Sequence, residues 1–193
     1  MPNLFYRGQF DSYKTKNFSK SFESIRESYI HDSNVYIRKT RVFLSHKHDD
    51  LDDLNGVIGM LEKSFNIEVY IDSIDEKMPK ITSGETAKRI KETIKECDRF
   101  ILLATEGAIE SKWCNWELGF GDAIKDKNLA LFPMTDKQNS SYKGNEYLEI
   151  YSYIAYENGY SKFSNGNYIN KGYYVITKRK GTLYYTPLEK WLS

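Results

Sequence analysis

The sequence predicts an α/β fold, in which helices flank a doubly wound parallel sheet of about five strands. Short runs of apolar, aromatic and β-branched residues are typical of strands, and they recur at residues 41–45, 68–71, 100–104 and 129–133. The segments between these runs have a helical period instead. Because a strand, a helix and a second strand in succession form a right-handed crossover, we expect these strands to pair in parallel.

Three helices are predicted by apolar residues that recur every three or four positions, which is the spacing of one helical face. The face of the first helix consists of Leu51, Leu54, Val57, Ile58, Leu61 and Phe65. The face of the second consists of Ala87, Ile90, Ile94 and Cys97. The third helix is expected to begin near Ser111, and its face consists of Trp113, Trp116, Phe120 and Ile124.

The core is expected to span residues 39–134, with an extension on each side. Residues 1–38 form an N-terminal extension that packs on the domain and contains a helix over 21–29. Residues 135–193 contain 11 of the 16 tyrosines, and we expect this Tyr-rich C-terminal extension to complete the same domain. Its predicted elements are a helix over 147–156 and a helix over 187–191. Between them, residues 173–177 and 182–185 are predicted to form either a hairpin or a strand followed by an edge segment.

The composition argues against several classes of partner. Lys and Arg number 28 against 27 Asp and Glu, so the net charge of +1 gives no field that would attract nucleic acid or a membrane surface. No apolar run approaches the roughly 18 residues of a membrane span, and the N-terminus lacks a signal-peptide pattern. We therefore expect a cytoplasmic protein with no membrane or nucleic-acid partner. The two cysteines and three histidines show no disulfide or metal signature, so no metal is expected.

Ligands of a doubly wound sheet bind beyond the carboxyl ends of its strands, so candidate residues should lie in the loops that follow residues 45, 71 and 104. Glu85 begins the helix after the second of these loops. The Thr82 to Glu85 spacing also fits a capping box, in which Glu85 would bond to the Thr82 backbone amide. Its other reading is catalytic, since a carboxylate can stabilise a cationic ribosyl transition state. Glu117 is expected to make a structural ion pair or backbone contact.

Two phosphate-binding signatures are missing, which excludes two enzyme classes. No Gly-x-Gly-x-x-Gly follows the first strand, and no Gly-x-x-x-x-Gly-Lys-Ser/Thr occurs, so neither a dehydrogenase nor a P-loop hydrolase is expected. A phosphoacceptor receiver domain would need an Asp at the end of the third strand, where this chain has Ala104 and Thr105. A receiver domain is therefore not expected either.

Three strings in the same order resemble the TIR domain family. Residues 43–46 (FLSH) with Asp49 and Asp50 are similar to its opening strand and loop, residues 70–72 (YID) to its second strand, and residues 113–118 (WCNWEL) to its Trp-Cys-x-x-Glu-Leu helix. The resemblance covers residues 40–134 and implies a flavodoxin-like, TIR-like sheet. In TIR domains that consume NAD, the catalytic glutamate begins the helix after the second strand and its loop, which is the place of Glu85 here.

The resemblance implies an activity. As a small stand-alone TIR-like protein with a Tyr-rich tail, this chain is most similar to the TIR-like component of the bacterial Thoeris anti-phage system. This resemblance implies an enzyme that uses NAD as substrate without a cofactor and breaks the nicotinamide–ribose bond. It also implies that the enzyme makes a cyclic ADP-ribose isomer, which activates a partner NAD-consuming effector. We expect Glu85 to be catalytic and the substrate-binding residues to be Phe43, Ser45, His46 and Asp72.

The resemblance also implies regulation. Activity is expected to wait for a phage-derived trigger and to involve TIR self-assembly. The alternative is a non-enzymatic TIR interaction module, although the loop over 72–82 lacks the Arg-Asp-x-x-Pro-Gly sequence common in signalling adaptors.

Overall fold

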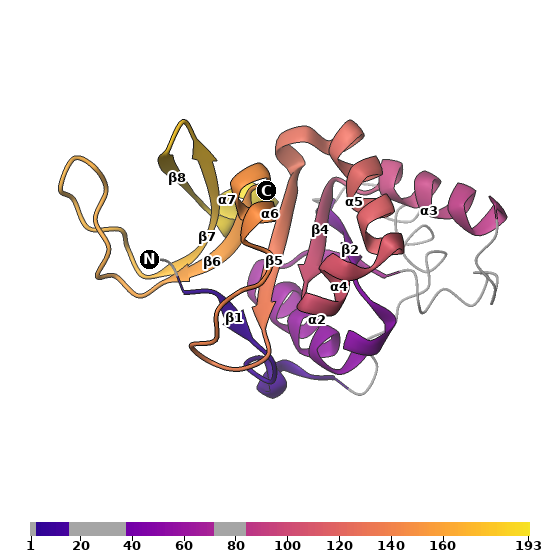
Figure 1. Cartoon of the computed structure of the whole chain (residues 1–193), viewed down its shortest axis with the longest axis horizontal. Coiled ribbons are helices and arrows are strands. Elements are labelled where there is room, and N and C mark those ends of the chain that lie inside the picture. The colour runs from indigo at the N-terminus through magenta and orange to yellow at the C-terminus, as the bar shows by residue number, and fades with distance from the viewer. Residues whose placement is uncertain (1–2, 16–37, 72–83) are drawn as a thin grey trace.

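A computed structural model of the chain describes residues 3–15, 38–71 and 84–193 (Figure 1). Within these residues, eight strands form one sheet. The strands are β1 (Phe5–Tyr6), β2 (Arg41–Ser45), β3 (Glu68–Tyr70), β4 (Arg99–Ala104), β5 (Leu129–Thr135), β6 (Tyr153–Glu157), β7 (Gly172–Arg179) and β8 (Thr182–Pro187). The helices are α2 (Leu51–Phe65), α3 (Gly84–Glu96), α4 (Glu106–Glu110), α5 (Lys112–Lys125), α6 (Asn145–Ile150) and α7 (Leu188–Leu192), with 3-10 turns η1 (Asp11–Tyr13), η2 (His48–Asp50) and η4 (Asp126–Asn128).

The strand order confirms the predicted fold class. Strands β3, β2, β4, β5 and β6 lie side by side in that order, and every neighbouring pair among them is parallel. This is the 2-1-3-4-5 order of a doubly wound, flavodoxin-like sheet, in which the direction of winding reverses between the first and third strands. Here that switch point lies between β2 and β4. Strands β7 and β8 extend the sheet in antiparallel pairing, and β1 pairs with β5 in parallel.

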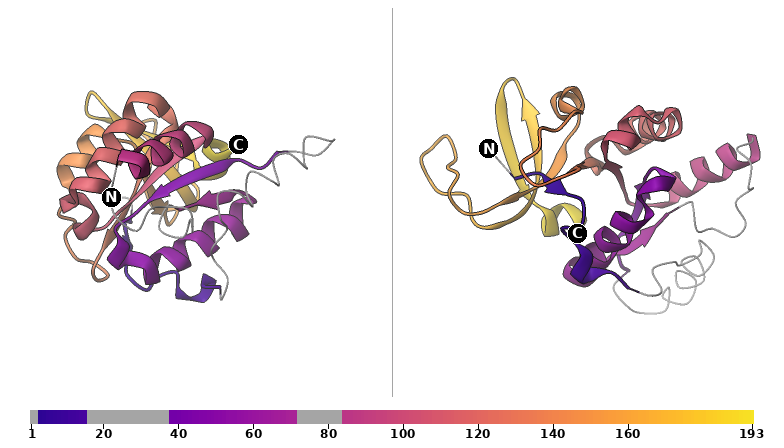
Figure 2. Two further views of the ribbon diagram at one scale, coloured as in Figure 1. Left: turned by 90° about the vertical axis from the view of Figure 1, so that its right-hand side faces the viewer. Right: turned by 60° about the horizontal axis from the view of Figure 1, so that its bottom comes forward.

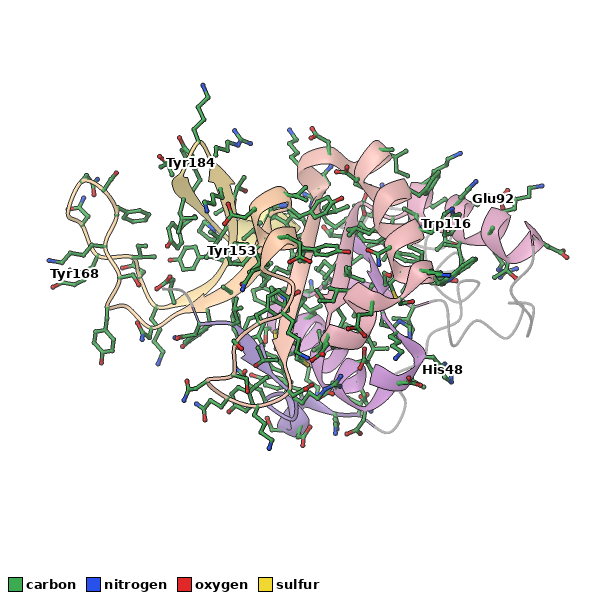
Figure 3. All side chains as sticks on the ribbon, viewed as in Figure 1. His48, Glu92, Trp116, Tyr153, Tyr168 and Tyr184 are labelled. Atoms are coloured by element: carbon green, nitrogen blue, oxygen red, sulfur yellow. The ribbon has the colours of Figure 1, made fainter. Side chains whose placement is uncertain are left out.

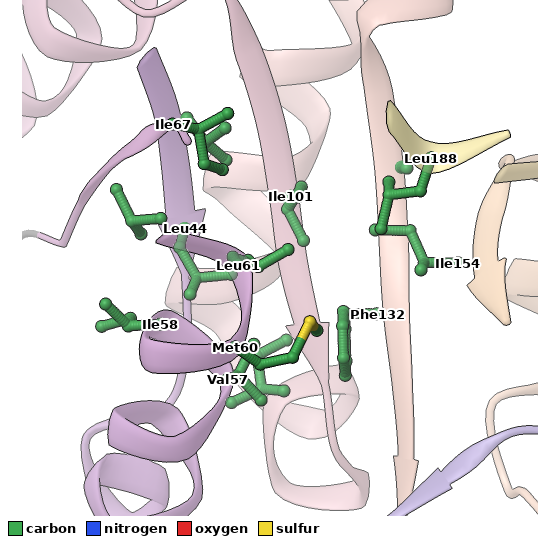
Figure 4. Close-up of a cluster of buried hydrophobic side chains, with 14 of the residues drawn as sticks. Leu44, Val57, Ile58, Met60, Leu61, Ile67, Ile101, Phe132, Ile154 and Leu188 are labelled. Atoms are coloured by element: carbon green, nitrogen blue, oxygen red, sulfur yellow. The ribbon is translucent and has the colours of Figure 1, made fainter. Parts of the chain in front are cut away.

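Helices cover both faces of the sheet because side chains alternate along each strand. Val42 and Leu44 of β2 belong to one buried cluster, which α2 and α7 complete (Figure 4). Phe43, between them in sequence, belongs to the opposite cluster, which is completed by α3, α4 and α5. Its ring stacks on Phe100 at 5.5 Å between centroids. The two clusters form the two layers of the core.

The predicted helix over 147–156 is wrong in its second half. Helix α6 ends at Ile150, and Tyr153–Glu157 form strand β6. Five residue pairs join β6 to β7, and Tyr153 also pairs with Leu131 of β5. These contacts are made with residues distant in sequence, and pairing of this kind overrides a local helical pattern.

The aromatic row of α5 is not its buried face. The buried residues of α5 are Cys114, Glu117, Leu118 and Gly121, whereas Ile124 is 40% exposed. Trp113, Trp116 and Phe120 are half-buried and form a stacked row beside that face. The expected start of the helix is confirmed, because the Ser111 side chain caps it by accepting a hydrogen bond from the Cys114 amide.

The Tyr-rich extension contains the predicted hairpin, β7 and β8. Lys180 and Gly181 connect these strands, and both have positive φ, as a tight two-residue hairpin turn requires. Most of its tyrosines contact other aromatic rings, such as Tyr174 against Tyr185 and Tyr156 against Tyr173. The remaining exposed tyrosines are on loops and on the outer strand, and Figure 3 labels two of them, Tyr168 and Tyr184.

The described N-terminal segment, residues 3–15, packs on α2 and on the edge formed by β5 and β6. Two glycines allow its close approach to α2, because a Cβ on Gly59 would lie 2.1 Å from the Tyr13 carbonyl oxygen and one on Gly56 2.7 Å from that of Phe10. The helix expected over 21–29 lies outside the described residues. The domain boundaries at residues 38 and 134 stay a prediction.

Candidate functional site at the sheet's switch point

The carboxyl ends of β2 and β4 diverge into loops at the switch point. Strand β2 ends at Ser45 and is followed by His46 and Lys47, while β4 ends at Ala104 and is followed by Thr105. Helices α2 and α4 then leave on opposite faces of the sheet. In doubly wound folds, ligands bind where two such loops diverge, beyond the carboxyl ends of the strands.

A buried hydrogen bond joins β2 to α5 beneath the switch point. Ser45 is fully buried and faces α5, and its hydroxyl donates a bond of 2.5 Å to Glu117 Oε2. Glu117 is only 1% exposed. A buried carboxylate needs such donors, because burial without compensation costs several kcal/mol, on the order of 2–7 for a neutral polar group and more for a charged one. This contact supports a structural role for Glu117, although it is made to a hydroxyl rather than through an ion pair or a backbone group.

A second buried carboxylate ties the two loops together. Thr105 Oγ1 donates a hydrogen bond of 2.6 Å to Asp50 Oδ2 and accepts one from the Ala108 amide at the start of α4. The same carboxylate accepts a bond of 2.7 Å on Oδ1 from Arg7. The loops after β2 and β4 are therefore held in a fixed relation.

Arg7 anchors the N-terminal segment to this edge of the sheet. Its guanidinium bonds Asp50, Asp53 and Asp136 at 2.7, 2.6 and 3.1 Å. Partial burial disfavours the charge, but the bonds to the three carboxylates outweigh that effect and raise the pKa of Arg7. Sequence reasoning missed Arg7 and Thr105, because Arg7 lies 43 residues from Asp50 and Thr105 lies 55 from it. In the sequence, only the adjacent Asp49 and Asp50 indicated a role at this edge of the sheet.

The predicted substrate-binding residues lie at different depths. Phe43 is fully buried between Tyr70 and Phe100. Ser45 is buried against Glu117, and His46 is 7% exposed, with Nδ1 3.4 Å from the Leu44 carbonyl oxygen. Asp72 lies outside the described residues. Substrate contacts by these four residues therefore stay a prediction.

Lys47, His48 and Asp49 are the accessible side chains of the first loop. Lys47 Nζ pairs with Asp49 at 3.1 Å, which raises the pKa of the lysine, and its stem lies over Gly107 of α4. Figure 3 shows His48 at the outer surface of the loop.

Glu85 lies in the first turn of α3, with an exposed side chain. Its end of α3 projects outward from the sheet (Figures 1 and 2). Among the described residues, no hydrogen bond or ion pair joins Glu85 to Ser45, to His46 or to any other side chain. The proposed capping partner, Thr82, lies outside the described residues. The capping-box role of Glu85 and its catalytic role therefore both stay predictions.

The stacked aromatic row of α5 supports α3. The Nζ atom of Lys91 on α3 lies 5.5 Å from the ring centres of both Trp116 and Phe120. A cation over an aromatic face is attracted by the ring quadrupole, by about 0.5–1 kcal/mol at exposed sites. The row therefore helps to orient the helix that carries Glu85, and Figure 3 shows Trp116 on the side of α5 that faces α3.

These features define a class of protein: a doubly wound sheet with its acidic and hydroxyl side chains at the switch point and a glutamate at the start of the helix after the second core strand. A family model of the TIR domain matches residues 42–164. The chain belongs to the TIR domain family.

One curated relative is similar over most of both chains. It is the probable 3′ cyclic ADP-D-ribose synthase ThsB′ of Bacillus cereus (strain MSX-D12), which is 30% identical over 154 residues, or 79% of this chain and 75% of the relative. Among solved structures, a prokaryotic SEFIR domain matches with 14% identity and a TM-score of 0.39 over 54% of this chain and 73% of that one. That structural likeness is too low to support any inference.

None of the helices in the described residues combines the length and the apolar character needed to cross a membrane. Among those same residues, no three His, Cys, Asp or Glu side chains are grouped closely enough to hold a metal ion.

Proposed function

We propose that this TIR protein cleaves NAD at the nicotinamide–ribose bond in anti-phage defence and forms a cyclic ADP-ribose isomer. The observation that carries the proposal is the 30% identity to a relative whose name describes a cyclic ADP-ribose synthase. The product would activate a partner NAD-consuming effector, and the enzyme would stay inactive until a phage-derived trigger, acting with TIR self-assembly, switches it on.

Glu85 is the proposed catalytic residue. As the bond from the anomeric carbon to nicotinamide breaks, its electron pair leaves with nicotinamide, which becomes neutral, and positive charge develops on the ribose. A carboxylate near that ribose stabilises the developing cation. Two features support this role: the place of Glu85 at the start of α3, and the exposed carboxylate that no described residue binds.

The group that attacks the ribosyl cation in the last step of the reaction determines the product. Attack by a nucleophilic group of the same substrate, with loss of its proton, closes a ring, whereas attack by water gives ADP-ribose. Ring closure needs a folded substrate and exclusion of water. We propose that the substrate lies over the switch point, with Phe43, Ser45, His46 and Asp72 lining its pocket.

A Glu85→Gln variant tests the proposal. The nucleotides of phage-challenged cells that express the parent or the variant would be measured by mass spectrometry. The parent should consume NAD and yield a product with the mass of ADP-ribose minus water, and the variant should do neither while folding normally.

Glu92→Gln is the matched control. Glu92 is an exposed glutamate on the same helix (Figure 3), so its substitution makes the same change of charge and should leave NAD turnover unchanged. Full phage protection by Glu85→Gln without NAD loss would reject the enzyme and favour the alternative, a TIR interaction module that acts by assembly alone.

A further inference from the structure

A cavity lies at the same edge of the sheet, away from the switch point. It has a volume of about 630 Å³ and lies where β5 and β6 end, between the N-terminal segment and the loop after β5. Binding sites for small molecules commonly occupy about 300–1,000 Å³. The cavity is therefore large enough for a nucleoside.

The walls of this cavity are held in place by hydrogen bonds. Asn3 and Tyr156 exchange two backbone bonds of 3.0 and 3.1 Å, and the Arg7 amide donates one of 3.0 Å to the Thr135 carbonyl oxygen. Thr135 Oγ1 lies 3.0 and 2.9 Å from the carbonyl oxygens of Phe5 and Lys137, and its proton can be donated to either. A ligand would thus meet a backbone that is already ordered, which reduces the entropic cost of binding.

Uncharged hydrogen-bonding side chains dominate the lining. Four of the lining residues carry amide side chains: Asn3, Gln9, Gln138 and Asn139. In the described part of the chain only the Gln9 amide is used, accepting a bond from the Tyr6 backbone. The other three amide groups have their donors and acceptors available for a ligand.

Two tyrosines add aromatic surface, since Tyr6 and Tyr156 also line the cavity. Among the described residues, no lysine or arginine lines it, and the nearby Arg7 is committed to three carboxylates. A phosphate would therefore find no cation. The lining matches a neutral planar ligand, because Asn and Gln pair with the edge of adenine and aromatic rings stack on any nucleobase.

We propose that this cavity is a nucleoside-binding site, distinct from the switch point and specific for an uncharged purine nucleoside. The inference does not rest on NAD cleavage, because it concerns a different cavity. Its position gives it a link to the rim, since Tyr6 and Gln9 flank Arg7, which bonds Asp50 in the loop after β2.

Calorimetric titration of the whole protein with adenosine tests the proposal. Saturable binding is expected, and the double variant Gln138→Ala/Asn139→Gly should weaken it by about tenfold or more, since each lost amide removes hydrogen bonds to the base. Gly at 139 preserves the backbone, because Asn139 has a φ of 64°. Gln138→Ala alone should weaken adenosine binding less than the double variant does. Because Gln138 is exposed, this single variant still tests the site if the double variant folds poorly.

Three controls define the site. Asn167→Ala removes an exposed amide elsewhere and should leave adenosine binding unchanged. Glu85→Gln should also leave it unchanged, which separates this cavity from the proposed catalytic site. Ribose and AMP should both bind more weakly than adenosine. The proposal is overturned by an absence of saturable adenosine binding, by equal affinity in the parent and the two cavity variants, or by ribose or AMP binding at least as tightly as adenosine.

Discussion

The hydroxyl of Ser45 donates a 2.5 Å hydrogen bond to the buried carboxylate of Glu117, and so joins the end of β2 to α5. The two residues lie 72 positions apart in the chain. Since Ser45 is also a proposed lining residue, the bond raises the question of whether its substitution affects folding or substrate binding.

A Ser45→Ala variant should lose stability. Removing the donor leaves Glu117 Oε2 without this hydrogen bond, and a buried acceptor deprived of a partner costs about 1–3 kcal/mol. Urea denaturation would measure the free energy of unfolding. In a double-mutant cycle with Glu117→Met, which removes the acceptor oxygens at similar size, the two losses should fail to add, because both variants remove the same bond. Additive losses would contradict the role of this bond, and a raised KM for NAD with unchanged stability would assign Ser45 to the substrate instead.

The strands of the core could be predicted from the sequence, whereas this bond could not. Residues 41–45, 100–104 and 129–133 are apolar enough to indicate buried strands wherever they pair. By contrast, β6 forms through its pairing with β5 and β7, which lie elsewhere in the sequence, so its own residues did not predict it. Strand β1 pairs with β5 through only two residues, which is too short a segment to recognise. The five-residue helix α4 shows no apolar period long enough to detect.

The candidate site, too, could be predicted only in part. The switch point follows from the order of strands and helices, so His46 and the following loop could be placed near it. The partners of the buried acids could not, because Glu117 meets Ser45 and Asp50 meets Thr105 and Arg7 only when distant elements pack together.

An Arg7→Met variant should detach the N-terminal segment from the edge of the sheet. Breaking a fully buried ion pair costs about 3–5 kcal/mol. Because the Arg7 side chain is 33% exposed, we expect about 2 kcal/mol. Lys14→Met is the control, since Lys14 pairs with the largely exposed Asp11 and Asp52 and should cost below about 1 kcal/mol. Hydrogen exchange should show faster exchange in residues 3–15 of the Arg7 variant only, and equal effects would contradict the anchoring role.

Alkaline solution should destabilise the fold through Tyr153. Burial raises the pKa of Tyr153 from its ordinary 10.0 to about 12. The folded state thus keeps its proton between pH 10 and 12, while the unfolded state loses it, so the free energy of unfolding falls as pH rises through this range. A shift of this size corresponds to about 2–3 kcal/mol.

Urea denaturation of the parent and of Tyr153→Phe at pH 9 to 12 would test this dependence. The variant cannot titrate at this position, so its stability should fall less steeply. Burial also raises the pKa of Cys97 to about 12 and raises the pKa of Tyr142, so some of the slope should remain. A slope that is identical in parent and variant would show that Tyr153 does not contribute.

Two helix glycines should respond in opposite directions to the same substitution. A Cβ on Gly59 of α2 would lie 2.1 Å from the Tyr13 carbonyl oxygen. Gly59→Ala must therefore push the N-terminal segment away, which should lower the free energy of unfolding by about 1–3 kcal/mol. A Cβ on Gly119 of α5 meets nothing within 4 Å. Gly119→Ala should raise the free energy of unfolding by about 0.5–1 kcal/mol, because alanine favours a helix. Urea denaturation gives the sign for each. If Gly59→Ala were as stable as the parent, the close approach of residues 10–13 to α2 would not exist in solution, and the cavity walled by the same N-terminal segment would lose part of its support.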